Sequence, residues 1–384
     1  MAVLGTLIEQ IRGVSYKPED LHATLNENSV ILLRANNIKD GEINLDDVVY
    51  VDRKKVSEKQ LLKAGDILIC ASSGSKELVG KAAYVKRDLP MTFGAFCKVV
   101  RPKTDCPQYI GHFFNSPYYR ERIANSAAGA NINNIRNEHI DVLEIAWPSM
   151  KKQRGAVTVL DKVTELISLR KEQLAKLDQL VKSRFIELFG DPVSNSSNLP
   201  ELTLPELGEF GRGVSKHRPR NDLKLLGGKY PLIQTGEVAN AQLYITEYEN
   251  TYSELGYKQS KLWQAGTLCI TIAANIAKTA ILTFDACFPD SVVGFKANEK
   301  TNNIFMHYWF SFFQAILEAQ APESAQKNIN LKILSELKII VPPIELQEQF
   351  AAFVEQTEKS KLAIQQSLDK LEILKKALMQ EYFG

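Results

Sequence analysis

Cysteine and histidine are scarce in this chain and are not grouped. The 384 residues contain five histidines and five cysteines, with no C-x-x-C pair and no spacing typical of Cys/His metal ligands. Zinc sites and disulfide frameworks both depend on such regular spacings. The sequence therefore predicts no zinc site, no other metal site and no disulfide framework. The five thiols are expected to be reduced and mostly buried: Cys70, Cys97, Cys106, Cys269 and Cys287.

Long apolar runs are also missing. The longest, around residues 30–33 and 337–343, are far shorter than a membrane span. Glu9 and Arg12 interrupt a very short apolar run at the N-terminus, which is unlike a secretory signal. We therefore expect a cytoplasmic protein that does not bind a membrane.

Motifs for catalysis on nucleic acids are not found. No N-P-P-Y or D-P-P-Y string occurs, and residues 210–213 (FGRG) miss the F-x-G-x-G cofactor loop by one position. Residues 227–229 (GGK) lack the upstream glycine and the following hydroxyl of a P-loop. Pro289-Asp290 and residues 336–338 (ELK) are too far apart to make a convincing nuclease motif. The chain is therefore expected to be non-catalytic by itself and to bind no cofactor.

The chain has almost no excess charge. Lys and Arg number 47 against 45 Asp and Glu, a net charge of +2. A protein that binds a polyanion alone usually has a larger basic excess, so nucleic-acid binding here would need local clusters or a partner that supplies phosphate contacts. The sharpest cluster runs from Arg212 to Lys224, in a Gly/Pro-punctuated stretch that predicts an exposed loop. A solvated basic face without a partner is the alternative.

What the sequence does contain is a duplication. Residues 148–190 and 342–384 align without a gap at an offset of 194. Ten pairs are identical: Pro148/Pro342, Gln153/Gln347, Leu174/Leu368, Lys176/Lys370, Leu177/Leu371, Leu180/Leu374, Lys182/Lys376, Glu187/Glu381, Phe189/Phe383 and Gly190/Gly384. This period is too long for a solenoid, so each copy must be a domain with its own helix.

Fainter matches precede the two helices in the same order. Residues 12–15 (RGVS) recur at 212–215, residues 63–69 resemble 264–270, and Asn131-Ile132-Asn133 resembles Asn328-Ile329-Asn330. Around them, short apolar runs have strand length and composition. We expect strands at 30–34, 67–71, 82–85, 96–100, 230–234, 267–272, 279–284 and 292–296, and helices at 109–128 and 304–321. Each globular part is thus predicted to be α+β, with a small irregular sheet.

The duplicated segments predict long amphipathic helices. Apolar positions recur with alternating spacings of three and four from Leu160 to Leu188 and from Val354 to Tyr382, which indicates a coiled-coil seam. Pro343 is expected at the first helical position, and Gly190 is a favourable stop. About 36 residues would reach roughly 54 Å. Antiparallel pairing of the two helices, related by a pseudo-twofold axis, would bury both apolar stripes.

These segments carry a resemblance to a known family. Residues 182–192 (KSRFIELFGDP) after the first helix, and 342–349 (PPIELQEQ) opening the second, resemble the specificity (S, HsdS-type) subunit of type I restriction-modification systems. The likeness covers the entire chain, although residues 148–153 (PSMKKQ) are a weaker version of the opening motif. The resemblance implies four parts: target recognition domain 1 at 1–147, spacer helix 1 at 148–190, target recognition domain 2 at 191–341 and spacer helix 2 at 342–384.

The resemblance implies a non-catalytic reader of double-stranded DNA. Each recognition domain would read one half of a bipartite, asymmetric site, and the helices would set the spacing and dock two methyltransferase (modification) subunits. Restriction subunits would join in the larger complex. S-adenosylmethionine, ATP and magnesium would be held by the partners. Two alternatives stay open: an enzyme with its own nuclease or DNA methyltransferase activity, and a protein-only coiled-coil scaffold.

Candidate DNA-binding residues are expected in loops before and after the shared strands, where basic, amide and hydroxyl side chains can reach phosphates and base edges. In the first half they are Arg12, Ser15, Tyr16, Lys17, Arg34, Asn36, Asn37, Ser72, Ser73, Ser75 and Lys76. In the second half they are Arg212, Ser215, Lys216, His217, Arg218, Arg220, Gln234, Thr235, Asn275 and Lys278.

Overall fold

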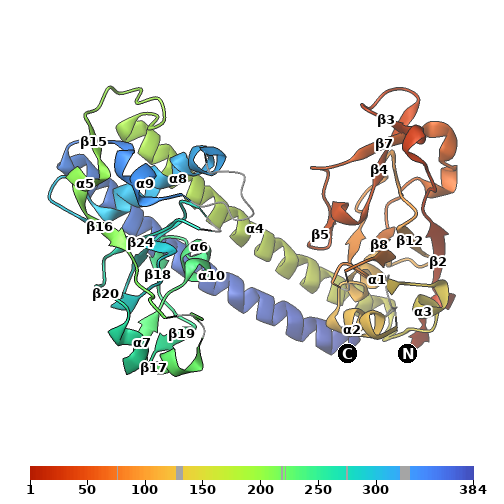
Figure 1. The fold of residues 1–384 in the computed structure, drawn as a ribbon. Helices are drawn as coiled ribbons and strands as arrows, with labels where there is room; N and C mark the ends of the chain where they lie inside the picture. Colours follow the sequence, from red (N-terminus) through yellow and green to blue (C-terminus); the bar gives the residue numbers. More distant parts are fainter. Residues whose placement is uncertain (76, 127–132, 218, 221, 274–275, 321–328) are drawn as a thin grey trace. The chain divides into compact units, whose positions relative to one another are not determined.

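The computed structural model describes residues 1–384 except 76, 127–132, 218, 221, 274–275 and 321–328. It divides into two compact units (Figure 1). Unit 1 comprises residues 1–172 and 365–384, and unit 2 comprises residues 173–364. Both chain termini therefore belong to unit 1. Each unit is α+β, as predicted.

Unit 1 is built on two four-stranded sheets. The first has the order β10 (Ala82–Tyr84), β8 (Ile67–Cys70), β12 (Cys97–Pro102) and β2 (Ile8–Arg12), with all neighbours antiparallel. The second has the order β11 (Met91–Phe93), β4 (Ser29–Leu33), β7 (Val49–Asp52) and β3 (Leu21–His22), with β11 parallel to β4. Three small pairs complete the set: β1 (Ala2–Val3) with β14 (Glu144–Ile145), β5 (Ile38–Lys39) with β6 (Glu42–Ile43), and β9 (Ser72–Ser73) with β13 (Asn133–Asn134).

The helix predicted at 109–128 is two helices. The structure has α1 (Pro107–Phe113) and α2 (Pro117–Ser126), followed later by α3 (Asn137–Asp141). Pro117 explains the break, because proline has no N–H to donate and disfavours helical backbone in the residue before it. It is well tolerated at the first position of a new helix, which is where α2 places it.

Unit 2 repeats this plan. Its first sheet has the order β16 (Gly208–Arg212), β24 (Val292–Ala297), β21 (Leu268–Thr271), β22 (Thr279–Leu282) and β18 (Tyr244–Ile245). Its second sheet has the order β19 (Asn250–Tyr252), β17 (Leu226–Leu232), β23 (Ala286–Cys287) and β20 (Leu262–Trp263). The remaining elements are the pair β15 (Glu201–Thr203) with β25 (Lys338–Ile340), and helices α5 (Leu204–Leu207), α6 (Thr235–Asn240), α7 (Glu254–Lys258), α8 (Asn303–Gln320) and α9 (Leu331–Glu336).

The strand registers confirm the duplication. Lys98 stands opposite Arg12 and Ile69 in unit 1, and Val293 stands opposite Arg212 and Ile270 in unit 2. One faint match needs correction. Ile135 N–H bonds Ala71 O (2.8 Å) and Ile329 N–H bonds Ile272 O (3.0 Å), so Ile329 corresponds to Ile135 rather than to Ile132. The rest of that match, at 131–132 and 328, lies outside the described residues. The offset from Ile135 to Ile329 is the same as between the two long helices.

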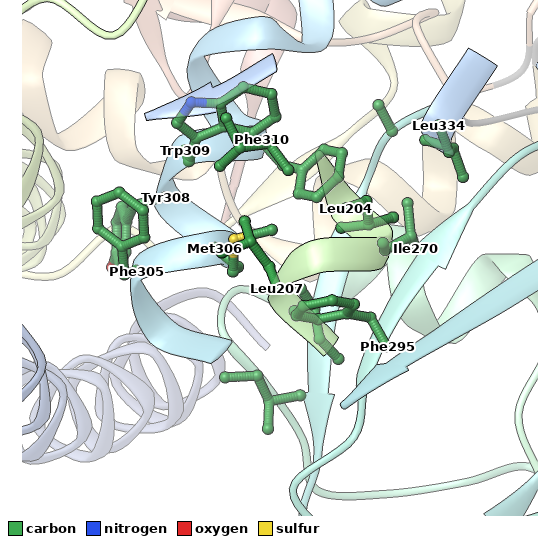
Figure 2. Packing of buried hydrophobic residues seen from close by; sticks show 14 of the residues in the cluster. Leu204, Leu207, Ile270, Phe295, Phe305, Met306, Tyr308, Trp309, Phe310 and Leu334 are labelled. Carbon is green, nitrogen blue, oxygen red and sulfur yellow. The ribbon is translucent and has the colours of Figure 1, made fainter. Parts of the chain in front are cut away.

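The first sheet of each unit is covered on both faces, which explains its unbroken apolar strands. Ile67 and Ile69 of β8 face the core that contains α1 and α2, whereas Leu68 and Cys70 face the second sheet. In unit 2, Ile270 packs in a core with residues of α8 and α5 (Figure 2). All five cysteines are buried and free, as expected, and burial raises the pKa of the Cys97 thiol to about 12.

The two long helices are confirmed. Helix α4 (Met150–Phe189) and helix α10 (Ile344–Phe383) have 40 residues each, and their bounds differ by the same offset as their sequences. Pro343 was expected at the first helical position, but α10 begins one residue later, at Ile344. The carbonyl of Pro343 accepts the N–H groups of Leu346 (3.0 Å) and Gln347 (3.2 Å), so Pro343 caps the helix instead of starting it. After α4, Gly190 takes a positive φ of 76°.

The pairing of α4 and α10 is antiparallel in each unit. In unit 1, Leu160 near the start of α4 shares a core with Met379 and Phe383 at the end of α10. In unit 2, Phe185 and Phe189 near the end of α4 pack on Phe350 near the start of α10, with ring centroids 5.4 and 5.6 Å apart. The predicted seam is therefore correct.

Two charged residues of the seam have polar partners on the opposite helix. Lys361, 6% exposed, contacts Asp178 (2.7 Å) and Glu358 (2.8 Å) in unit 2. The Arg170 Nε–H donates to Ser367 Oγ (3.2 Å) in unit 1. These polar contacts keep charge within an otherwise apolar seam without leaving it unsatisfied. Within the described parts of the chain, no helix is long and apolar enough to span a membrane.

Candidate nucleic-acid interface

Arg12 and Arg212 occupy equivalent positions at the ends of β2 and β16. Both side chains are exposed. Among the described residues, neither guanidinium has a hydrogen-bond or ion-pair partner. A free, exposed guanidinium is suited to binding phosphate or a guanine edge. The duplication thus places one available arginine at the same edge of each unit.

The glycine that follows each arginine is required by close packing. A Cβ on Gly13 would lie 2.1 Å from the carbonyl oxygen of Gly94, and a Cβ on Gly213 would lie 2.1 Å from that of Phe288. No other residue fits there without moving backbone. The repeated Arg-Gly-Val-Ser motif therefore marks the same close approach of two backbone segments in both units. It lies where the chain leaves the first sheet and passes beside the second.

The residues after Gly13 have mixed surroundings. Ser15 and Lys17 are exposed, and Lys17 lies 3.5 Å from Glu19, both more than 70% exposed. Such a solvent-exposed pair adds little stability, so the Lys17 ammonium can exchange Glu19 for a phosphate. Tyr16 is half-buried and packs against the small core around Val14 and Leu32.

Arg34, Asn36 and Asn37 converge on one loop. Arg34 (2.9 Å) and Asn36 (2.7 Å) both donate to Asp47 Oδ2, and Asn37 donates to the Asn44 (2.9 Å) and Asp47 (2.8 Å) carbonyls. Asn37 is 0% exposed and also accepts the Arg34 N–H through Oδ1 (2.8 Å). It stabilises the loop and is therefore removed from the set that can reach DNA. Arg34 and Asn36 remain on the surface.

The predicted second loop of unit 1 begins at β9. Ser72 and Ser73 are half-buried and pair with β13, and Ser75 is exposed. Lys76 lies outside the described residues. Asn134, exposed and opposite Ser72, and Phe96, 69% exposed in the adjoining turn, were not selected from the sequence. Only the strand pairing brings them to this loop, so no local signal in the sequence identified them.

The basic loop of unit 2 is anchored by an amide. Gln259 Oε1 accepts the backbone N–H groups of Lys216 (2.5 Å) and His217 (2.9 Å). Lys216 is exposed and has no ion pair within the described residues. His217 lies 3.1 Å from Asp222, and Arg220 pairs with Asp290. The pKa of Asp222 is lowered, first by the Lys224 N–H and then by His217.

Two other predictions for this loop have different outcomes. Ser215 is 6% exposed, so it is removed from the surface set. Arg218 lies outside the described residues. Lys216 is therefore an accessible cation of the loop, whereas Arg220 must leave Asp290 to bind a phosphate.

The remaining unit 2 residues start helices or follow strands. Gln234 is exposed and its N–H donates to Glu237 Oε2 (3.2 Å), while Thr235 is the half-buried first residue of α6. Lys278 is exposed in the loop between β21 and β22, which matches the position of Ser72 to Ser75 after β8. Asn275 lies outside the described residues.

These sites have the chemistry of a binding surface. Exposed cations, hydroxyls and amides can contact phosphates and base edges. Among the described residues, no group of three or more His, Cys, Asp or Glu could hold a metal ion. Arg101 is not available to a phosphate, because it makes a two-pronged ion pair with buried Asp66, at 2.7 Å for both contacts.

Comparison with known proteins places this architecture in a family. The model of the type I restriction modification DNA specificity domain matches residues 18–179 and 201–373. The EcoKI type I specificity subunit of Escherichia coli K12 is 26% identical over 393 residues, covering 93% of this chain and 81% of that protein. The StySPI specificity subunit of Salmonella potsdam is 38% identical over 182 residues. That match covers 47% of this chain and spans 39% of the relative's length.

Solved structures share the fold. The S subunit of a type I restriction-modification system from M. genitalium has a TM-score of 0.59 at 15% identity and covers 100% of this chain and 95% of its own. A chain from a study of type I restriction-modification complex assembly has a TM-score of 0.57 at 17% identity, covering 99% and 96%. Since the family model matches twice and covers most of the sequence, this chain belongs to the type I restriction-modification DNA specificity family and carries two copies of its domain.

Proposed function

We propose that this chain is the non-catalytic DNA-recognition subunit of a type I restriction-modification complex. Each unit reads one half of a bipartite, asymmetric site in double-stranded DNA. Methylation and cleavage belong to partner subunits, which would hold S-adenosylmethionine, ATP and magnesium. The chain itself contributes binding energy and sequence preference.

The observation that carries this proposal is a shared framework with divergent loops. Arg12 and Arg212 keep the same register in the two sheets, whereas the polar residues on the neighbouring loops differ between the units. Phosphate contacts position a protein on DNA, and contacts to base edges specify sequence. Equivalent arginines therefore suit phosphate contacts common to both units, and the divergent loops suit two different half-sites.

The long helices have a second role in the proposal. They set the separation of the half-sites and dock two methyltransferase subunits, with restriction subunits joining the larger complex. Two side chains at equivalent positions support the docking role: Leu180 is 49% exposed and Leu374 is 46% exposed. In this proposal the two leucines form part of the surface that contacts the methyltransferase subunits.

The test is a comparison of half-site preferences. The double variant Lys216→Ala/Arg220→Ala should weaken binding at one half-site by about tenfold or more, because two cations are lost near one half of the DNA. The matched variant Arg12→Ala/Lys17→Ala should weaken the other half. Binding is measured with the methyltransferase partner on DNA libraries that randomise one half-site at a time.

Specific outcomes would contradict the proposal. Equal loss at both half-sites from either variant would exclude modular reading. Purified chain that alone cuts or methylates DNA would establish the enzyme alternative. A complex without any sequence preference would favour a protein-only scaffold.

A further inference from the structure

Phe96 is an exposed aromatic residue in the turn between β11 and β12. Its side chain is 69% exposed, although the flanking strands are buried. The turn is fixed, because Cys97 N–H bonds Gly94 O (2.8 Å) and Gly94 N–H bonds Leu33 O (2.9 Å). The ring is therefore held on an ordered backbone.

This turn lies between two segments that carry candidate DNA-binding residues. The carbonyl oxygen of Phe96 accepts the N–H groups of Ala71 (2.9 Å) and Ser72 (3.0 Å). On its other side, Gly94 forms a parallel bridge with Val14, whose N–H bonds Phe93 O (2.8 Å). The turn thus lies between the segment that carries Arg12, Ser15 and Lys17 and the segment that carries Ser72 to Ser75.

Unit 2 shows that the fold does not need this ring. Cys97 stands opposite Cys70 in unit 1, and Val292 stands opposite Thr271 in unit 2, so Phe96 corresponds to Ser291. The backbone contact is the same: Ile272 N–H bonds Ser291 O (3.1 Å) as Ala71 N–H bonds Phe96 O. The framework is shared and only the side chain differs.

The chemistry of the ring limits what it can contact. A phenyl group has no charge and no hydrogen-bonding atom, so it cannot bind a phosphate. In the major groove the apolar feature of a base edge is the 5-methyl group of thymine, which phenylalanine contacts in known complexes. The neighbouring serine hydroxyls suit hydrogen bonds to base edges in the same groove. Wedge residues that unstack bases act instead from the minor groove.

We propose that Phe96 is a specificity-determining residue of unit 1 and contacts the 5-methyl group of a thymine in the half-site that this unit reads. The inference rests on the proposed function and adds a residue and a base feature to it. Unit 2, with Ser291 at the same position, makes no such contact from this turn.

The test replaces each thymine of the half-site in turn by deoxyuridine, which lacks only the 5-methyl group. Binding is measured with the full chain and its methyltransferase partner. At one position, the replacement by deoxyuridine should weaken DNA binding by the unsubstituted protein about threefold to tenfold. This is the value of one or two buried methyl-sized contacts. Phe96→Ser, which introduces the residue found in unit 2, should lose about the same affinity on normal DNA and show no response to deoxyuridine there.

Controls separate this contact from other effects. Val142 is also 69% exposed in unit 1, and Val142→Ala should keep the deoxyuridine response. Thermal unfolding should be unchanged in Phe96→Ser, because an exposed ring adds little to stability. A half-site without A·T pairs, or a deoxyuridine effect that persists in Phe96→Ser, would overturn the inference while leaving the proposed function intact. If the complex of the unsubstituted chain with its partner binds all DNA sequences equally, the proposed function itself is refuted.

Discussion

His307, on α8, shows how one half-buried side chain ties stability to pH. Its Nδ1 lies 3.0 Å from Thr279 Oγ1, and burial, with the Lys361 cation nearby, lowers its pKa from about 6.5 to about 4. Imidazole therefore stays neutral in the folded protein under conditions in which the unfolded chain takes up a proton. Stability from this residue is present above pH 6.5 and is lost as the pH falls toward 4.

We expect the variant His307→Gln to have a shallower loss of stability in acid. At pH 5, protonation of His307 in the unfolded state should cost the unsubstituted protein at most about 2 kcal/mol relative to pH 7.5. The glutamine variant lacks this contribution. Urea unfolding followed by tryptophan fluorescence suits the measurement, because Trp263 and Trp309 are both buried in unit 2. Identical pH dependence in the two proteins would contradict the prediction.

At the scale of elements, the two long helices have equivalent glutamines in their first turns, and the side-chain amides of these glutamines have different hydrogen-bond partners. Gln153 Nε2 donates to Pro148 O and Gln347 Nε2 donates to Pro342 O, each at 2.9 Å. Gln347 also accepts from Thr301 Oγ1 (2.9 Å) and the Asn302 N–H (3.2 Å). Within the described residues, Gln153 Oε1 is buried without a partner. The same motif therefore stabilises the second helix more than the first.

The duplication makes this difference testable with matched variants. Gln347→Leu should destabilise the protein by about 2–4 kcal/mol, because it leaves the buried Thr301 hydroxyl and the half-buried Asn302 N–H without their acceptor. Gln153→Leu should cost about 1 kcal/mol or less, since one hydrogen bond is lost and one unsatisfied oxygen is removed. Chemical denaturation of both variants gives the comparison. Equal losses, or a larger loss for Gln153→Leu, would show that the extra hydrogen bonds of Gln347 contribute nothing.

At the scale of the whole molecule, the proposal makes the paired helices a ruler for DNA. Readers of adjacent turns of B-DNA need a defined separation of roughly 34 Å. A stiff helical pair can enforce such a separation, because forty residues rise about 60 Å. A flexible linker of the same length would tolerate many separations.

Insertion of one heptad into both α4 and α10, at positions that face each other, should lengthen the preferred gap between half-sites by about three base pairs. Seven residues add about 10.5 Å and keep the seam in phase, and one base pair rises about 3.4 Å. The gap is measured on DNA libraries with variable spacers. A heptad inserted into only one helix should disrupt the seam and abolish binding, which serves as the control. An unchanged gap in the double insertion would remove the helices from the role of ruler.

Some features of this protein follow from the sequence by itself. The alternation of three and four in the apolar positions of α4 and α10 is local and periodic, so it predicts both helices and their seam. The strands of the first sheets, such as β8 and β21, are short apolar runs bounded by turn residues, and these too are readable without coordinates. The gapless repeat identifies the duplication, because two copies of one fold keep the same buried positions.

Other features depend on contacts between residues distant in the chain, and only the tertiary structure decides them. Asn37 and Asn36 are neighbours with the same side chain, yet one is buried in a loop core and the other is on the surface. Phe96 is of a residue type that is common in strands, yet it lies exposed in a turn, because strand pairing places this turn between two polar loops. A periodic pattern determines which face of an element is buried, whereas the burial and partners of a loop residue are determined by how the sheets pack around it.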